Sequence, residues 1–252
     1  RDAEVRRAAR VAWAEYELSN GHAVVAVKVL RQVETAALSS EQALAVRFLL
    51  AEALFAAGKP ELADEQFDWL TKQAEVLSPK PEWLAAVALR RGELLVRARD
   101  IPAARRWLLQ AKRDHADFAL AYEFDYLLAR CAVAQIEFDQ ARVLLQQVIS
   151  APAAHGTEAA ARAAWMLGEV YFLQRKYPQA MDAYEQVARM TAFPDWQARA
   201  LLQSAKCHEL LGQAAQALAD YQRALQLSQQ PDIQQQATER VGAIESLSPT
   251  LR

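Results

Sequence analysis

The stretch that decides the fold spans residues 165–187 and reads WMLGEVYFLQRKYPQAMDAYEQV. Gly168 in its first half and Ala180 in its second are small residues. Where two helices cross, small residues let the backbones approach closely, and Tyr184, four residues after Ala180, lies one turn along the same face. Pro178 stands where the second helix would begin, a position at which its missing N–H costs little. The stretch therefore predicts a helical hairpin.

The same frame recurs along the chain and is marked by an alanine in each predicted second helix. Successive alanines are separated by 37, 41, 37, 39 and 37 residues. Self-similarity at a period of 20 to 50 residues is the signature of repeat architectures. The marker alanines are Ala26, Ala63, Ala104, Ala141, Ala180 and Ala217.

This pattern resembles the tetratricopeptide repeat (TPR) family, whose unit is a helix–turn–helix of about 34 residues. The resemblance implies an all-α fold, a right-handed α-solenoid of about six TPR-like helical hairpins plus a C-terminal capping helix. We expect the repeat array over residues 1–231, and the capping helix and tail over residues 232–252. The approximate units are 7–40, 44–77, 85–118, 122–155, 161–194 and 198–231.

Other residue types fit the same frame. Gly92 and Gly168 are predicted at helix crossings. Gly21, Gly58 and Gly212 are predicted at turns, where a positive φ is useful. The segment VVAVKV (24–29) is rich in β-branched residues, which favour strands, but the helical frame across it predicts a helix. The cysteines, Cys131 and Cys207, share one repeat position and are expected to be small buried residues.

Composition excludes several classes of protein. The chain has 252 residues, 29 basic and 31 acidic side chains and a net charge of −2, which argues against a nucleic-acid-binding or polybasic membrane surface. No apolar run reaches the roughly 18 residues of a membrane helix, so we expect no direct membrane insertion. The chain opens RDAEVRRAARVAWAEY, without an initiator Met, which favours a piece of a longer protein.

No motif for catalysis is present. The sequence lacks HExxH, GxSxG, GxGxxG and a phosphate-binding glycine-rich loop. The four histidines fall in different repeats without metal-ligand spacing, and we interpret them as solvated or packed residues. We therefore expect no enzyme activity, no catalytic residues, no cofactor and no metal.

The family resemblance also indicates a binding surface, because the first helix of each hairpin lines the inner groove of such arrays. It implies a groove with an apolar floor and an acidic line that turns basic towards the C-terminus, and such grooves bind helices or extended peptides. The alternative is that the apolar residues belong to the core between helices. The predicted peptide-binding residues are Phe48, Glu52, Phe55, Leu89, Glu93, Tyr126, Arg130, Trp165, Glu169 and Phe172.

The leading hypothesis is a non-catalytic protein–protein interaction scaffold that binds a protein or peptide ligand, and not nucleic acid. A homo-oligomerisation module and a regulatory or recruitment segment of a larger multidomain protein are the alternatives. The last two units contain alanine- and glutamine-rich repeats such as QAMDAYEQVARM, and in this they loosely resemble repeat domains of bacterial envelope assembly and cell-division factors. The compartment stays open between the cytoplasm and the periplasm or envelope, and partner identity is not predicted.

Overall fold

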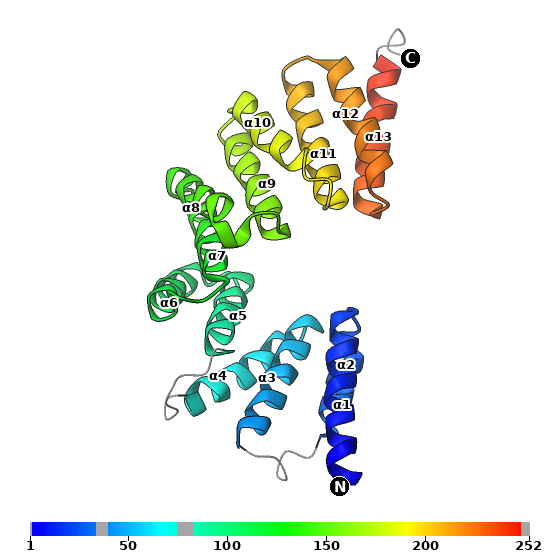
Figure 1. The fold of residues 1–252 in the computed structure, drawn as a ribbon. Helices are drawn as coiled ribbons and strands as arrows, with labels where there is room; N and C mark the ends of the chain where they lie inside the picture. Colours follow the sequence, from blue (N-terminus) through cyan, green and yellow to red (C-terminus); the bar gives the residue numbers. More distant parts are fainter. Residues whose placement is uncertain (1, 34–39, 75–82, 248–252) are drawn as a thin grey trace. The chain divides into compact units, whose positions relative to one another are not determined.

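The computed structural model describes residues 2–33, 40–74 and 83–247, and these residues form thirteen α-helices, one short 3-10 helix and no strand. The all-α prediction is confirmed (Figure 1). The segment 24–29 lies in a helix, as predicted.

The chain divides into two compact units, residues 1–118 and residues 119–252. Unit 1 contains α1 (Asp2–Ser19), α2 (Ala23–Leu30), α3 (Ser40–Ala56), α4 (Pro60–Ala74), α5 (Trp83–Arg97) and α6 (Ile101–Asp114). Unit 2 contains α7 (Ala121–Ala134), α8 (Phe138–Ser150), a 3-10 helix (Pro152–Ala154), α9 (Glu158–Leu173), α10 (Tyr177–Ala188), α11 (Pro194–Leu210), α12 (Ala214–Leu227) and α13 (Pro231–Leu247).

Consecutive helices pack as hairpins: α1 with α2, α3 with α4 and α5 with α6 in unit 1, then α7 with α8, α9 with α10 and α11 with α12 in unit 2. We call the odd-numbered member of each pair the first helix and its partner the second helix. First helices also contact one another: α1 contacts α3 in unit 1, and α9 contacts both α7 and α11 in unit 2. This is the stacking expected of a helical repeat.

Each hairpin reverses at one residue with a left-handed backbone, five residues before the marker alanine. The N–H of the following residue returns to a carbonyl five residues earlier, as from Lys59 to Leu54 at 3.0 Å and from Lys176 to Tyr171 at 3.0 Å. This is the Schellman pattern that ends a helix. The left-handed residues are Gly21, Gly58, Arg99, Ile136, Arg175 and Gly212, with φ between 58° and 80°.

The helices of a hairpin touch through small residues, as predicted. A Cβ placed on Gly168 would lie 2.3 Å from the ring of Tyr184, and one on Gly92 would lie 2.3 Å from Leu108. The marker alanines are fully buried, and so is Tyr184. Both cysteines are buried free thiols, in agreement with the sequence.

Among the described residues α13 is not followed by a second helix, and it packs on α12 and α11. Ile233 and Ala237 are fully buried in this contact, and Ile244 is nearly so. Isolated helical hairpins leave an apolar face that a neighbour must cover. The helix α13 therefore covers the last hairpin, as the prediction of a capping helix requires.

Candidate interaction surface on the first helices

All ten predicted groove residues lie on first helices, and they fall into two sets of five. Unit 1 carries Phe48, Glu52 and Phe55 on α3 and Leu89 and Glu93 on α5. Unit 2 carries Tyr126 and Arg130 on α7 and Trp165, Glu169 and Phe172 on α9. The surface formed by first helices in each unit is called the first-helix face of that unit.

The apolar members of the two sets are more deeply packed than an open groove floor would be. Phe55, Leu89 and Tyr126 are buried, with exposed fractions of 7–8 %. Phe48 is half-buried and stacks on Trp83 with 6.1 Å between ring centroids. These side chains contribute mainly to contacts between helices.

The two remaining aromatic residues, Trp165 and Phe172, are half-buried on α9. The Trp165 ring lies 5.8 Å from that of Trp196 on α11, and Phe172 lies 5.7 Å from Tyr177 on α10. The Nε1 atom of Trp165 is buried and has no hydrogen-bond acceptor among the described residues. Part of each ring is therefore held by the fold, and part remains accessible from the first-helix face.

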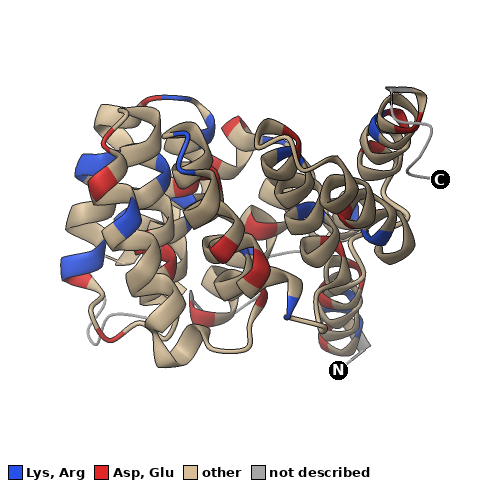
Figure 2. Cartoon of the chain, turned by 90° about the horizontal axis from the view of Figure 1, so that it is seen from above, with Lys and Arg blue, Asp and Glu red and all other residues tan. Residues whose placement is uncertain are grey.

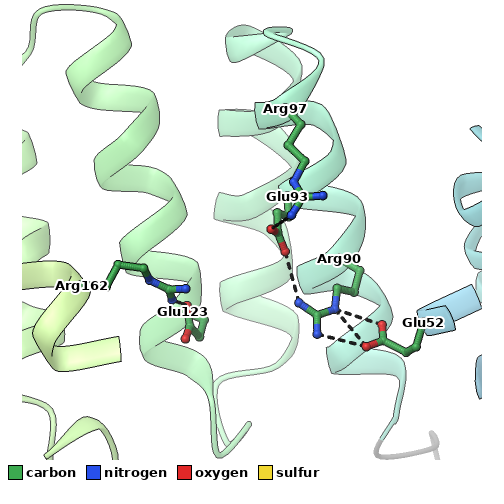
Figure 3. Close-up of polar contacts among 6 residues, drawn as sticks. All are labelled: Glu52, Arg90, Glu93, Arg97, Glu123 and Arg162. Carbon is green, nitrogen blue, oxygen red and sulfur yellow. Dashed lines mark hydrogen bonds and ion pairs between the residues drawn. The ribbon is translucent and has the colours of Figure 1, made fainter. Parts of the chain in front are cut away.

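The acidic line of unit 1 is paired with arginines from the same face (Figure 3). Arg90 on α5 donates from Nε to Glu52 Oε1 at 3.0 Å and from Nη2 to Glu52 Oε2 at 3.0 Å, which ties α5 to α3. Arg90 Nη1 also donates to Glu93 Oε2 at 3.2 Å, and Arg97 Nη2 donates to Glu93 Oε1 at 2.8 Å. Two carboxylates thus face two guanidinium groups, and the face is closer to neutral than its acidic residues alone imply.

Arg90 and Arg97 are not among the residues predicted for the site. Their spacing carries a signal, because Arg90 and Arg97 stand three residues before and four residues after Glu93 on one helix. Residues three and four apart are neighbours on a helical surface. Both guanidinium groups also lie over the Phe55 ring, at 5.0 Å and 4.4 Å from its centroid.

Unit 2 repeats this ladder with different residues. Arg162 on α9 donates from Nη2 to Glu123 Oε2 on α7 at 2.6 Å (Figure 3) and lies 4.2 Å from the centroid of the Tyr126 ring. Arg240 on α13 pairs with Glu209 on α11. In each case an arginine on one helix reaches back to a glutamate on the preceding first helix, so the ladder aligns successive repeats.

Glu169 and Lys206 make the centre of the unit 2 face electrostatically unusual. The hydroxyl group of Tyr184, on the second helix α10, donates to Glu169 Oε1 at 2.6 Å. Burial raises the pKa of the Glu169 carboxyl, and the Tyr184 bond and Lys206 oppose that rise. Burial likewise lowers the pKa of the Lys206 ammonium, opposed by Glu169. Both groups are poorly solvated, and a charged partner group would gain more here than at an exposed site.

A hollow of about 360 Å³ opens beside this pair. It is lined by Phe172, Lys206, Glu209, Leu210 and Arg240. The Leu210 side chain is 56 % exposed. The hollow thus combines an apolar wall with two cationic groups, one of which is already paired with Glu209.

Unit 1 has a hollow of about 590 Å³ on its first-helix face, between α1 and α3, whose lining includes Val11, Glu15 and Val46. Basic and acidic residues are interspersed over the helices (Figure 2). In the described ranges no set of three or more His, Cys, Asp or Glu side chains is placed to hold a metal ion. None of the helices in those ranges is long and apolar enough to cross a membrane.

Comparison with known proteins supports the repeat assignment. Two models described as "Tetratricopeptide repeat" match residues 162–189 and 198–231. These segments correspond to the hairpins α9–α10 and α11–α12. No curated protein sequence matches the chain.

Solved structures share the fold at low sequence identity. Pseudomonas aeruginosa PilF superposes with a TM-score of 0.64 at 17 % identity, covering 95 % of this chain and 99 % of that one. PilW, titled a widely conserved type IV pilus biogenesis factor, gives 0.68 at 17 % identity and coverages of 91 % and 97 %. The apo form of RapI gives 0.74 at 12 % identity and coverages of 96 % and 72 %. The hairpins α9–α10 and α11–α12 are thus tetratricopeptide repeats by sequence, and the solved structures share the fold over 91–96 % of the chain.

Proposed function

We propose that the chain is a non-catalytic protein–protein interaction scaffold that holds a peptide or helix against the first-helix face of unit 2. The observation that carries the proposal is the hollow beside Lys206. There an exposed Leu210 and a half-buried Phe172 adjoin the ammonium group of the half-buried Lys206. An apolar wall with a few placed polar groups is the usual composition of a ligand site.

The hollow also suggests which ligand side chains would be accepted. An apolar anchor would cover Phe172 and Leu210, and a neighbouring acidic group would reach Lys206. Arg240 is less available because it forms an ion pair with Glu209, whereas Lys206 donates only to the neutral amide oxygen of Gln236, at 3.3 Å. Unit 1 is a weaker candidate for electrostatic recognition, since Glu52 and Glu93 are already bonded to arginines. We therefore place the main contact in unit 2 and assign the predicted residues of unit 1 a supporting role.

A selection from a displayed library of random peptides tests this proposal, because it does not require the natural partner. We expect enriched peptides to carry an apolar residue close to an aspartate or glutamate. Leu210→Asp places a charge in the hollow, and Lys206→Glu reverses its cation, so each variant should lose these peptides. Val143→Asp is the matched control, because Val143 is 59 % exposed on the second helix α8.

Loss of binding in the Val143→Asp control as well, or full retention in both hollow variants, would place the contact elsewhere. Circular dichroism of each variant checks that helical content is unchanged. Leu210 and Val143 are exposed, so we expect these variants to stay folded, since surface substitutions usually change stability by less than about 0.5 kcal/mol.

An oligomerisation module is the second candidate function, and one observation favours it. Val5, Trp13 and Tyr16 on α1 are each more than half exposed and lie on one side of that helix. Apolar side chains gathered on one face commonly mark a protein contact. Sedimentation velocity of the chain and of its Tyr16→Ser variant tests this, because self-association through α1 would be concentration-dependent and weakened by the substitution. A monomer at all concentrations removes this candidate.

A further inference from the structure

A second hollow, of about 370 Å³, lies on the second-helix side of unit 2. It opens between α10 and α12 with α11 as its floor, and it shares no lining residue with the hollow beside Lys206. Met181, Ala188 and Leu201 contribute apolar wall, and Ser204 and His208 on α11 contribute polar atoms. This hollow is not used by the function proposed above.

The hollow exists because Ser204 is short. In the repeat frame Ser204 stands two residues before Lys206, and the preceding hairpins carry long side chains at the matching position. In unit 2 the matching residues Leu128 and Leu167 are buried. The four hairpins from α3–α4 to α9–α10 carry, at the position of Ser204, Leu50, Arg91, Leu128 and Leu167.

Arg91 shows what the equivalent space holds in unit 1. Its guanidinium group reaches from α5 to α4, with Nε 3.2 Å from Asp64 Oδ1 and Nη1 3.5 Å from Asp68 Oδ1. It also lies 4.7 Å from the centroid of the Trp107 ring on α6. In unit 1 the space between successive second helices is therefore occupied by a cation that the chain itself supplies.

Part of the acidic environment of that cation persists in unit 2, where the arginine is absent and Met181 stands in the place of Asp64. In the repeat frame Glu185 corresponds to Asp68, and Asp220 corresponds to Trp107. The charged residues that line the hollow are three acids, Asp182, Glu185 and Asp220, and two arginines, Arg189 and Arg223. With His208 neutral the lining thus has a net charge of −1, from −3 and +2. Arg189 is bonded to Glu185 at 2.6 Å and is 75 % exposed. Arg223 is 60 % exposed, and its Nη1 atom lies 3.4 Å from Asp220 Oδ1. Both arginine side chains are thus mostly exposed at the rim of the hollow.

His208 and Asp220 leave a position that a hydrogen-bond donor would fill. His208 Nδ1 lies 2.6 Å from Gln213 Oε1, and the tautomer with the ring proton on Nδ1 donates to that amide oxygen. In that tautomer Nε2 is an acceptor and lies 3.8 Å from Asp220 Oδ2, which is also an acceptor; the other carboxylate oxygen, Oδ1, faces Arg223. A guanidinium group has five N–H donors in a rigid fork and can donate to two neighbouring acceptors at once.

We propose that the hollow between α10 and α12 binds an arginine side chain of a partner protein, in the place that Arg91 fills by itself in unit 1. The partner's guanidinium group would donate to Asp220 and His208, and its aliphatic stem would pack on Met181 and Leu201. This gives the chain a contact on its second helices that is separate from the first-helix face.

The test uses N-acetyl-arginine methylamide as probe and N-acetyl-citrulline methylamide as its neutral counterpart of the same shape. Binding is followed by NMR of the chain labelled with ¹³C at the methionine methyl groups. Met181 lines the hollow, whereas Met166 lies on α9 and serves as an internal control. We expect the arginine probe to shift the Met181 signal in a saturable manner, with the Met166 signal unchanged and the citrulline probe at least tenfold weaker. A net loss of about 1.5 kcal/mol for one charge-assisted bond corresponds to this ratio.

Three variants sharpen the result. Asp220→Asn should weaken the arginine probe roughly tenfold, whereas Asp139→Asn, an 88 % exposed acid on α8, should leave it unchanged. Ser204→Arg should fill the hollow from within, abolish probe binding and raise the melting temperature, and Ser204→Gln should not raise it. Equal binding of arginine and citrulline, preferential binding of N-acetyl-glutamate methylamide, or no shift of Met181 would each overturn the proposal.

Discussion

At the scale of single residues, every hairpin turn needs one residue with a positive φ, but this residue is not always glycine. Three hairpins reverse at glycine, but the other three reverse at Arg99, Ile136 and Arg175 with the same positive φ. A β-branched residue is strained in this region. Ile136 has φ 62° and is 73 % exposed, so its side chain gains little burial to offset that strain.

We therefore expect Ile136→Gly to stabilise the protein by about 1 kcal/mol, because glycine adopts the left-handed conformation without steric cost. Urea denaturation followed by circular dichroism measures the change. Ile136→Ala serves as control, since it shortens the side chain and keeps the Cβ. A variant Ile136→Gly less stable than Ile136→Ala would show that the turn is not strained.

A second prediction at this scale concerns the helix crossing at Gly168. A Cβ at this position would meet the buried Tyr184 ring at 2.3 Å, so Gly168→Ala forces the two helices apart or displaces the ring. We expect a loss of about 1–3 kcal/mol, as for overpacked cores. Gly242→Ala in α13 is the matched control, because nothing lies within 4 Å of its added Cβ. It should gain roughly 0.5–1 kcal/mol from helix propensity alone, and thermal melting distinguishes the two signs.

At the scale of helices, the arginine ladder fixes how one hairpin meets the next. Arg90 bonds Glu52 on α3 and Glu93 on its own helix, with only 20 % and 19 % of the carboxylate side chains exposed. Removing the cation leaves two poorly solvated carboxylates without their shared partner. We expect Arg90→Gln to cost about 1–3 kcal/mol.

The control for that substitution is Arg189→Gln, which breaks the surface pair with Glu185. Such i,i+4 pairs contribute only about 0.3–0.5 kcal/mol. Urea denaturation of the two variants gives the comparison. If both substitutions cost equally little, the ladder is a surface feature that does not align the repeats.

The helices and their crossings were predictable from the sequence, but the exposure of their side chains was not. The 37- to 41-residue frame locates each hairpin because small residues must meet at every crossing, as Gly168 and Ala180 do. The same frame does not reveal that Tyr126 is buried under Arg162, since a first helix of 14 to 18 residues contacts neighbours on several sides. It also cannot show that Glu52 is paired, because the partner Arg90 lies 38 residues away.

At the scale of the whole molecule, the chain folds into two compact units divided after residue 118. The repeat frame gives no sign of this division, because the spacing from Ala104 to Ala141 is 37 residues, as elsewhere. The boundary predicted from the sequence lies elsewhere, between the repeat array over residues 1–231 and the capping helix and tail over residues 232–252. That boundary stays a prediction. A regular period records which residues form a hairpin, but it does not record which hairpins form a compact unit.

We expect residues 119–252 to fold alone, because this unit contains its own buried clusters around Tyr184 and Tyr221 and is covered by α13. Circular dichroism of the isolated segment should show a helical spectrum and a cooperative thermal transition. The same segment without α13, residues 119–230, should melt at a lower temperature because it exposes the apolar face of α12. An unstructured segment 119–252 would mean that the two units depend on each other for stability.

The left-handed turn residue always precedes the marker alanine by five positions, and this has a consequence for insertions and deletions. A few residues added between Arg175 and Ala180 would rotate α10 and carry Tyr184 away from Gly168. A whole period, copied or removed at the boundary between two hairpins, would leave every other turn and crossing in place. Insertion or deletion of a whole repeat should thus be tolerated, whereas insertion or deletion of a few residues should not. Relatives of this protein should therefore differ in length by entire hairpins.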